Sequence, residues 1–415
     1  MRYRNTRKAQ RTYRNRLAAV TVACALLGTA GVLPGAAASA SVGPSRQNGA
    51  ALRAALRADL THYLATRHKA EHISAVGLRV TYPGNTPSIN LAAGTTRYHG
   101  GPPVSTSALW QVGSNTKAFT AVILLQLEAE GKLSINDPLG RWLPQYPAWR
   151  HVTIRQLLNM TSRIPDYALQ PAFDAALAKD PGTRFTAARL ISYAVGVPLA
   201  PQGFYYSNTN YILIQMIIEK VTHDSYADQL TKRIITPLRL RNLCYAPYTC
   251  PRADVARMPA GYFFEAGAPP LLGKPMPRLA ETWTQAAGGI VSSLADLTTW
   301  ERALYQGQEL PPAQQHQLES LISETTGQPI SSTTTADPNG YALGLTQLTY
   351  KPLGTVWWYR GGPLGYRVEH FYFPSSGLII ALATNSSVNN NNDGLFSTAV
   401  SVYQTLEKAG AVHTG

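Results

Sequence analysis

The chain has 415 residues, of which 45% are hydrophobic and only 14% are charged. Such a chain can bury a sizeable core, which excludes an intrinsically disordered protein and favours one large domain or two interleaved lobes. The net charge is +14, but seven of the 37 basic residues precede residue 41, where Asp and Glu are absent, and no dense Lys/Arg stripe follows. This distribution argues against a nucleic-acid-binding protein.

The first 40 residues have the layout of an export signal. A basic start is followed by an apolar run over residues 17–33, and Ala38-Ser39-Ala40 offers a small-x-small cleavage site. We expect residues 1–40 to be removed and the chain to be exported, to the periplasm or as a secreted protein. An uncleaved membrane anchor is the alternative, disfavoured because the run is short and rich in Ala and Gly. The surface basicity of the remaining chain would suit association with an anionic cell wall.

The elements that follow the signal predict a helix, a hairpin and a second helix. Residues 47–70 alternate Leu and Ala with Arg and Asp at helical spacing, which predicts an amphipathic helix. Residues 73–82 and 88–98 are typical of two strands joined by a Pro-Gly-Asn turn. Residues 114–130 carry enough apolar side chains for a helix buried nearly all round, with Ser114 near its first turn.

The middle of the chain, residues 135–285, shows short helices and loops with few alternating strand signals. Helices are predicted there at residues 154–160, 187–196, 210–221 and 226–235, and further helices at 294–305 and 396–408. Strands are predicted at residues 343–350, 355–359, 366–372 and 378–385. The expected fold is α/β (α+β): a mainly antiparallel sheet built from both chain ends and flanked by helices. Residues 41–134 and 286–415 would form this α/β lobe, and residues 135–285 a mostly helical lobe.

Two cysteines, Cys244 and Cys250, stand six positions apart beyond the signal. In an exported chain this pair predicts a local disulfide. A metal site is the weaker interpretation, because the two thiols have no nearby His to complete a ligand set and the nine histidines contain no HExxH. We expect no metal and no cofactor.

Two short motifs could carry chemistry. Ser114 and Lys117 stand three positions apart, so a helical turn would place both side chains on one face and let the amine accept or hold the hydroxyl proton. Tyr206 and Asn208 form a Tyr-x-Asn sequence. A Tyr has a pKa near 10, so it acts as a base at neutral pH only if a cation lowers that pKa, and Lys117 is the candidate cation.

Each motif alone has a structural explanation. Ser114 could be a helix cap beside a surface Lys117, and Tyr206 a buried ring followed by a loop Asn208. The surroundings change this balance, because several stretches in the same order resemble the serine β-lactamase-related proteins and D-alanyl-D-alanine carboxypeptidases, the class C β-lactamase-like group. These stretches are residues 113–120, 124–133, 137–144, 153–158, 206–211, 217–222 and 286–293, and the resemblance covers about residues 50–408.

The third motif of this group is Lys or His, any residue and Gly, on a strand beside the nucleophile. The best match is Tyr359-Arg360-Gly361-Gly362. Gly361 retains the close backbone approach, and the resemblance implies that the amides of Gly362 and Ser114 form an oxyanion hole. Asn208 would orient Lys117 and the acyl amide.

Two positions depart from the family pattern. Tyr359 removes a cation that would meet a substrate carboxylate, and Arg360 or Arg367 is expected to compensate. Some esterases of this fold carry an aromatic residue there, so the departure weakens the peptidase and β-lactamase assignments in particular. Arg163 stands where the family usually has Gly, which would strain the backbone if that position needs a positive φ.

The resemblance implies a serine hydrolase in which the substrate acylates Ser114 while Lys117 and Tyr206 take the serine proton. It implies no cofactor. A D-alanyl-D-alanine carboxypeptidase or penicillin-binding hydrolase on cell-wall peptides is the first expectation. A carboxylic-ester hydrolase is the second, and a non-catalytic penicillin-binding-like protein is the third. The expected ligands are a small peptide, a β-lactam or an ester, without nucleic acid, and we expect a monomer.

Overall fold

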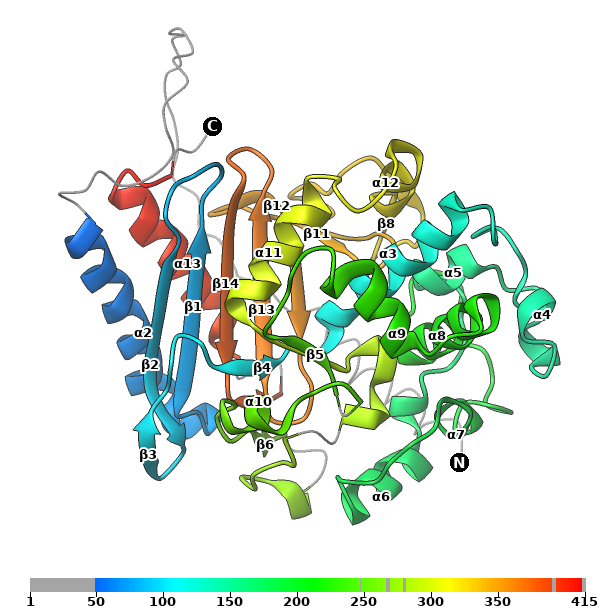
Figure 1. Ribbon diagram of the computed structural model, residues 1–415, viewed down its shortest axis with the longest axis horizontal. Helices are drawn as coiled ribbons and strands as arrows, with labels where there is room; N and C mark the ends of the chain where they lie inside the picture. Colours follow the sequence, from blue (N-terminus) through cyan, green and yellow to red (C-terminus); the bar gives the residue numbers. More distant parts are fainter. Residues whose placement is uncertain (1–48, 247, 266–268, 279–280, 390–392, 413–415) are drawn as a thin grey trace, which may run out of the picture.

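The computed structural model describes residues 49–246, 248–265, 269–278, 281–389 and 393–412 (Figure 1). The predicted export signal, residues 1–40, lies outside this part of the chain. Within the described ranges, no helix has both the length and the apolar character needed to cross a membrane.

The described residues form one large sheet of ten strands, in the order β3-β2-β1-β14-β13-β12-β11-β10-β8-β9. Every pairing in it is antiparallel. The strands are β1 (Ala75–Thr81), β2 (Ile89–Arg97), β3 (Gly100–Pro103), β8 (Leu321–Ser323), β9 (Pro329–Ile330), β10 (Asn339–Tyr341), β11 (Thr346–Tyr350), β12 (Gly354–Gly361), β13 (Arg367–Phe373) and β14 (Leu378–Thr384). Because β1 lies between β2 and β14, the predicted antiparallel sheet built from both chain ends is confirmed.

Helices cover both faces of this sheet. They are α2 (Gly49–Glu71), α3 (Thr116–Ala129), α11 (Leu294–Tyr305) and α13 (Leu395–Lys408). In Figure 1, α2 and α13 lie beside each other at the edge that carries β1 and β2, and the two helices are in contact. Helix α11 packs on β1 and β14 from the other face.

Burial on both faces explains the unbroken apolar run of β14. Leu378 and Ile380 belong to the smaller core, under α2 and α13. Ile379 and Ala381 belong to the larger core, which includes α11 and α3. Since successive side chains of a strand point to opposite faces, a strand covered on both sides needs apolar residues at every position.

Residues 135–285 contain mostly helices, with two short strands among them. These elements are α4 (Leu139–Trp142), α5 (Ile154–Leu158), α6 (Pro171–Lys179), α7 (Ala187–Ser192), α8 (Asn208–Thr222), α9 (Tyr226–Leu230), α10 (Arg252–Ala256), β5 (Leu243–Tyr245) and β6 (Tyr262–Phe264). The long helix α3 lies against α8 and is buried over most of its length, as its apolar composition predicts.

The two short strands join small sheets that sequence patterns did not indicate. Strand β5 pairs with β7 (Ile290–Ser293), which also pairs with β4 (Leu109–Gln111). Strand β6 pairs in parallel with β15 (Ser386–Val388). Each has three or four residues, which is too short for a period-two pattern to stand out from a loop.

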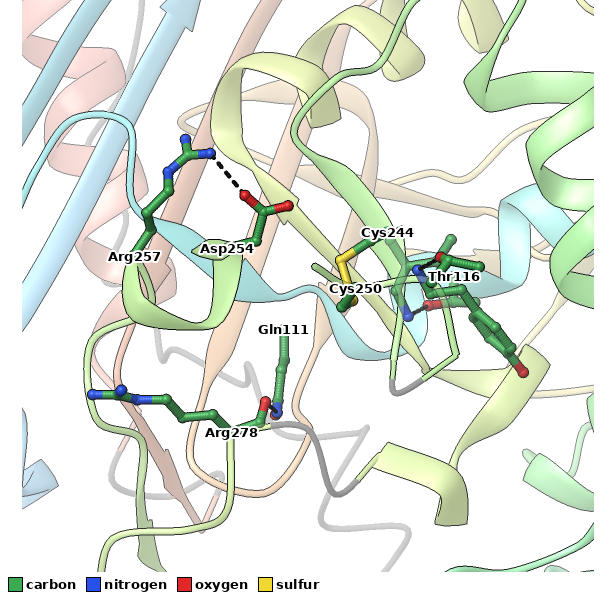
Figure 2. Close-up of a disulfide and its surroundings, with 10 residues drawn as sticks. Gln111, Thr116, Cys244, Cys250, Asp254, Arg257 and Arg278 are labelled. Atoms are coloured by element: carbon green, nitrogen blue, oxygen red, sulfur yellow. Dashed lines mark hydrogen bonds and ion pairs between the residues drawn. A yellow bond between two sulfur atoms is a disulfide. The ribbon is translucent and has the colours of Figure 1, made fainter. Parts of the chain in front are cut away.

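A disulfide joins Cys244 on β5 to Cys250, with their Cα atoms 5.0 Å apart (Figure 2). Cys244 lies opposite Val291 on β7, and the preceding amide, that of Ile290, donates to the Thr116 hydroxyl at the start of α3 over 3.2 Å. The bridge therefore closes the loop that follows β5. Strand β5 in turn pairs with β7, whose Ile290 amide contacts the beginning of α3.

Two local features differ from the expected pattern: the start of strand β11 and the backbone conformation of Arg163. The strand predicted over residues 343–350 begins at Thr346, because Gly344 has a φ of 83° and the Ala342 amide donates to the Leu345 carbonyl in a tight turn. Arg163 has a φ of 64°, the left-handed conformation that a Gly adopts more readily. Its guanidinium Nε donates to the Ala200 carbonyl over 2.6 Å, which secures the loop despite the backbone strain.

Candidate active site

Ser114 lies in a single 3₁₀ turn, Gly113–Asn115, immediately before α3. The serine thus precedes the α-helix rather than occupying its first turn. Gly113 has a φ of 54°, and a Cβ on it would lie only 2.6 Å from Pro363 Cδ and 3.0 Å from the Gly362 amide nitrogen. Glycine at this position therefore allows the turn that carries the nucleophile to approach the end of β12.

Lys117 is fully buried one turn further on and reaches back to the serine. Its Nζ lies 3.1 Å from Ser114 Oγ, 2.9 Å from Asn208 Oδ1 and 2.8 Å from the Ala287 carbonyl oxygen. Burial lowers the pKa of Lys117 to about 7, against the opposing charge of Asp166. As a neutral amine, Lys117 can donate to Asn208 and Ala287 and direct its lone pair at the serine hydroxyl.

Tyr206 is the second side chain that contacts the serine, and Lys117 Nζ lies over its ring, 4.8 Å from the centroid. Its hydroxyl donates to Ser114 Oγ over 2.9 Å and lies 3.4 Å from the Tyr359 hydroxyl, which in turn lies 3.0 Å from that of Tyr341. Burial raises the pKa of Tyr206 well above its ordinary value. The expectation that Lys117 lowers this pKa is therefore wrong, and the phenol stays protonated at neutral pH.

A carboxylate that the motifs did not reveal completes the group. Asp166 is buried, and its Oδ2 accepts from Asn208 Nδ2 over 3.1 Å. This bond determines the rotamer of the amide, because Asn208 must then present its oxygen to Lys117. Burial raises the pKa of Asp166 to about 6, although hydrogen bonds and the Lys117 charge oppose that rise. Asp166, Asn208 and Lys117 form a chain of contacts ending at the nucleophile.

The glycines of the third motif bring β12 against the nucleophile turn. A Cβ on Gly361 would lie 1.8 Å from the Val112 carbonyl oxygen, so no other residue fits there without moving a strand. Gly362 lines the same cavity as Ser114, and its amide nitrogen is close to Gly113. This placement suits the oxyanion hole that the resemblance implies.

The arginines that were expected to replace the missing cation are both engaged elsewhere. Arg360 forms ion pairs with Asp393 and, at 3.8 Å, with Glu369. Arg367 is buried and pairs with Asp393 and, at 2.7 Å, with Glu71. Both line the cavity, but their charges are already matched, so neither compensates for Tyr359.

The cavity over Ser114 has a volume of about 990 Å³. Tyr206, Tyr341 and Tyr359 form a wall of hydroxyl groups beside the nucleophile, and Phe173 and Trp283 supply apolar surface. Its size is sufficient for a small peptide-like ligand. Within the described ranges, no three His, Cys, Asp or Glu side chains gather as a set of metal ligands.

Comparison with known proteins places this site in a family. Residues 44–400 match the Beta-lactamase family model. Penicillin-binding protein 4* of Bacillus subtilis is 28% identical over 278 residues, which cover 64% of this chain and 58% of that protein. Protein flp of Staphylococcus aureus is 28% identical over 249 residues, 58% of this chain and 46% of that protein. The chain thus spans about half the length of these relatives.

Solved structures extend the likeness over nearly the whole chain. A D-stereospecific amidohydrolase from Streptomyces sp. is 27% identical, with a TM-score of 0.67 over 81% of this chain and 94% of that one. A D-amino acid amidase from Ochrobactrum anthropi, 22% identical, has a TM-score of 0.72 over 86% and 99%. The D-alanine carboxypeptidase AmpC of Burkholderia cenocepacia, 20% identical, has a TM-score of 0.63 over 85% and 99%. The chain therefore belongs to the Beta-lactamase family and has the serine β-lactamase fold of its hydrolase members.

Proposed function

We propose that this chain is an exported serine hydrolase that cleaves amide bonds of small peptide-like substrates through an acyl-enzyme on Ser114. The observation that carries this proposal is the convergence of Lys117 Nζ and the Tyr206 hydroxyl on Ser114 Oγ, at 3.1 and 2.9 Å. The structural alternative, in which Ser114 caps the helix beside a surface lysine, does not fit. Lys117 is fully buried, and its Nζ also contacts Asn208 Oδ1.

The first step is attack of Ser114 Oγ on the substrate carbonyl carbon. The neutral amine of Lys117 takes the hydroxyl proton as the C–O bond forms, and the amides of Ser114 and Gly362 stabilise the oxyanion. The Tyr206 hydroxyl then gives its proton to the leaving nitrogen and recovers one from the Lys117 ammonium, while the C–N bond breaks. Tyr206 thus relays the proton, because its raised pKa keeps it protonated.

The second step releases the acyl group. Water enters in place of the departed amine, gives a proton to Lys117 and attacks the ester carbonyl. Collapse of the tetrahedral intermediate breaks the bond to Ser114 Oγ, which recovers its proton. The free acid leaves and the enzyme returns to its starting protonation state.

Amides of D-amino acid residues are the substrate class that the neighbours favour. The solved structures include a D-stereospecific amidohydrolase, a D-amino acid amidase and a D-alanine carboxypeptidase, and each of these names refers to D-configured substrates. Export to the periplasm or the cell exterior would bring the enzyme to the cell wall, where peptides with D-residues occur. A D-alanyl-D-alanine carboxypeptidase is the form of this activity suggested first by the sequence.

A carboxylic-ester hydrolase on the same scaffold is the second candidate. It is favoured by Tyr359, whose buried hydroxyl occupies the place of the usual Lys or His and contacts Tyr206 and Tyr341. An ester needs less help in expelling its leaving group than an amide does. Binding without catalysis is disfavoured, because the nucleophile, the amine and the phenol are all in contact.

Mass spectrometry of the purified chain tests the proposal. The protein is exposed to a labelled penicillin and, separately, to a fluorophosphonate, with Ser114→Ala as the control. A Ser114-dependent penicillin adduct supports the peptidase form. Fluorophosphonate labelling alone, with turnover of short esters, favours the esterase, and no adduct with either reagent would refute the acyl-enzyme.

A further inference from the structure

Glu324 is one of the cavity carboxylates that have no role in the mechanism above. Glu324 directly follows β8, and its amide donates to the carbonyl of Asn339, the first residue of β10, over 3.0 Å. It is half-buried and lines the same cavity as Ser114 and Tyr206. Its charge also lies close enough to Tyr206 to raise the pKa of that phenol.

Within the described part of the chain, Glu324 has no ion-pair partner and no side-chain hydrogen bond. Burial, with a smaller contribution from the neighbouring Asp337, raises its pKa to about 7. A carboxylate in this situation lacks a cation, and a bound ligand with a positive group would supply one.

Acidic side chains also outnumber basic ones along the cavity wall. The described lining carries five carboxylates (Asp174, Glu265, Glu324, Glu369 and Asp393) and two guanidinium groups (Arg360 and Arg367). Both guanidinium groups are held in ion pairs on the wall itself. Lys117 is fully buried, and its Nζ is already in contact with Ser114, Asn208 and the Ala287 carbonyl. Among the described lining residues, a substrate carboxylate therefore finds no available cation, whereas an ammonium finds the unpaired carboxylate of Glu324.

We propose that Glu324 binds the free ammonium of the substrate and selects aminoacyl amides and esters over N-acylated or carboxylate-terminated peptides. This inference rests on the proposed function, because it concerns substrates that acylate Ser114. One cavity is lined by Ser114, by Glu324 and by the hydroxyl wall of Tyr206, Tyr341 and Tyr359. An amino acid residue whose carbonyl carbon faces Ser114 would extend its α-ammonium along this wall toward Glu324.

The test compares two chromogenic substrates that differ only at the amine: D-alanine p-nitroanilide and its N-acetyl derivative. The wild-type enzyme is expected to have the higher kcat/KM for the free amine, by about 10- to 100-fold, the range of a charged hydrogen bond. Glu324→Gln should remove this advantage and leave kcat/KM for the N-acetyl substrate within about twofold. The N-acetyl substrate also reports whether the variant is folded and active.

Asp174→Asn is the matched control, since Asp174 is an exposed carboxylate of the same cavity on α6. It should leave the ratio between the two substrates within about threefold, because solvent and salt screen an exposed charge. The inference is overturned if Glu324→Gln leaves the ratio unchanged, or lowers both rates equally, which would indicate an effect through Tyr206. If neither substrate nor p-nitrophenyl acetate is hydrolysed in a Ser114-dependent way, the proposed function fails as well.

Discussion

A lysine whose pKa lies near neutrality can supply the amine that a serine nucleophile needs. Burial lowers the pKa of Lys117 to about 7, and only its deprotonated form can accept the Ser114 proton. We expect kcat/KM to fall tenfold per pH unit below about 7 and to level off above it. Initial rates from pH 5 to 9 measure this fall, the acid limb of the pH profile. A flat profile across that range would contradict the assignment of Lys117 as the base.

Lys117→Arg is the companion variant. A guanidinium cannot be deprotonated at these pH values, so the charge would be kept and the base lost. The expected result is a fall in kcat/KM of at least about 1,000-fold at every pH, as for removal of a catalytic group that acts with its neighbours. Residual activity that still rises through pH 7 would indicate another base.

We infer that Asp166 positions Asn208, whose side-chain amide donates to it. In Asp166→Asn the negative charge that raises the Lys117 pKa is gone, so the acid limb of the profile should move to lower pH. The amide introduced at this position has one acceptor oxygen instead of two and can turn its NH2 group toward Asn208. This weakens the bond that orients Asn208, so kcat should fall by about 10- to 100-fold. Asp166→Glu keeps the charge and is expected to retain the position of the limb. A purely structural role would lower kcat without moving the limb.

The four candidate site residues come from sequence motifs, but the carboxylates that surround them do not. Ser114, Lys117, Tyr206 and Asn208 lie in short motifs whose spacing has chemical meaning, and the structure brings them together. Asp166 is a lone acidic residue in a loop, which no local pattern separates from a surface residue. The Tyr206 pKa was also inaccessible, because it depends on burial by residues distant along the chain.

The close contact between β12 and the 3₁₀ turn of the nucleophile can be tested with two adjacent glycines. Gly361→Ala would place a Cβ 1.8 Å from the Val112 carbonyl oxygen, so the strand or the turn must move. We expect it to cost about 3 kcal/mol or more of unfolding free energy, as in other overpacked sites. Gly362→Ala meets nothing within 4 Å and should leave that free energy within about 0.5 kcal/mol. Urea unfolding followed by circular dichroism makes the comparison, and equal stabilities would refute the contact.

Long periodic elements were predictable and short ones were not. The strand expected at residues 378–385 is β14, Leu378–Thr384, and the helix expected at 294–305 is α11, Leu294–Tyr305. Strands β8, β9 and β10 have two or three residues each and carry no periodic signal. They depend on pairing with β11 and with one another, which only the assembled sheet provides. Glu324 and Tyr341 belong to this region, so their part in the site was equally hidden.

At the scale of the whole molecule, a buried charge cluster joins the two ends of the described chain. Glu71, at the end of α2, accepts from Arg367 on β13 over 2.7 Å and from the Gly394 amide before α13 over 2.7 Å. Glu71→Gln would remove one of the negative charges beside the buried Arg367 guanidinium. We expect a loss of about 3–5 kcal/mol of unfolding free energy. Glu130→Gln, the same substitution at a partly exposed pair with Arg233, should cost less than about 1 kcal/mol. Urea midpoints at pH 7 measure both, and similar losses would contradict the buried cluster.

The order of the strands also governs when activity can arise during synthesis. Val76 on β1 pairs with Thr384 on β14, and the nucleophile turn is completed only by Gly361 and Gly362. A ribosome must therefore make most of the chain before the central sheet can close, since its key pairing is long-range. Until then the oxyanion hole that we propose is incomplete, and we expect the nascent polypeptide to be inactive. The same delay would keep it unfolded enough to be threaded through a translocation channel on the export route that we propose.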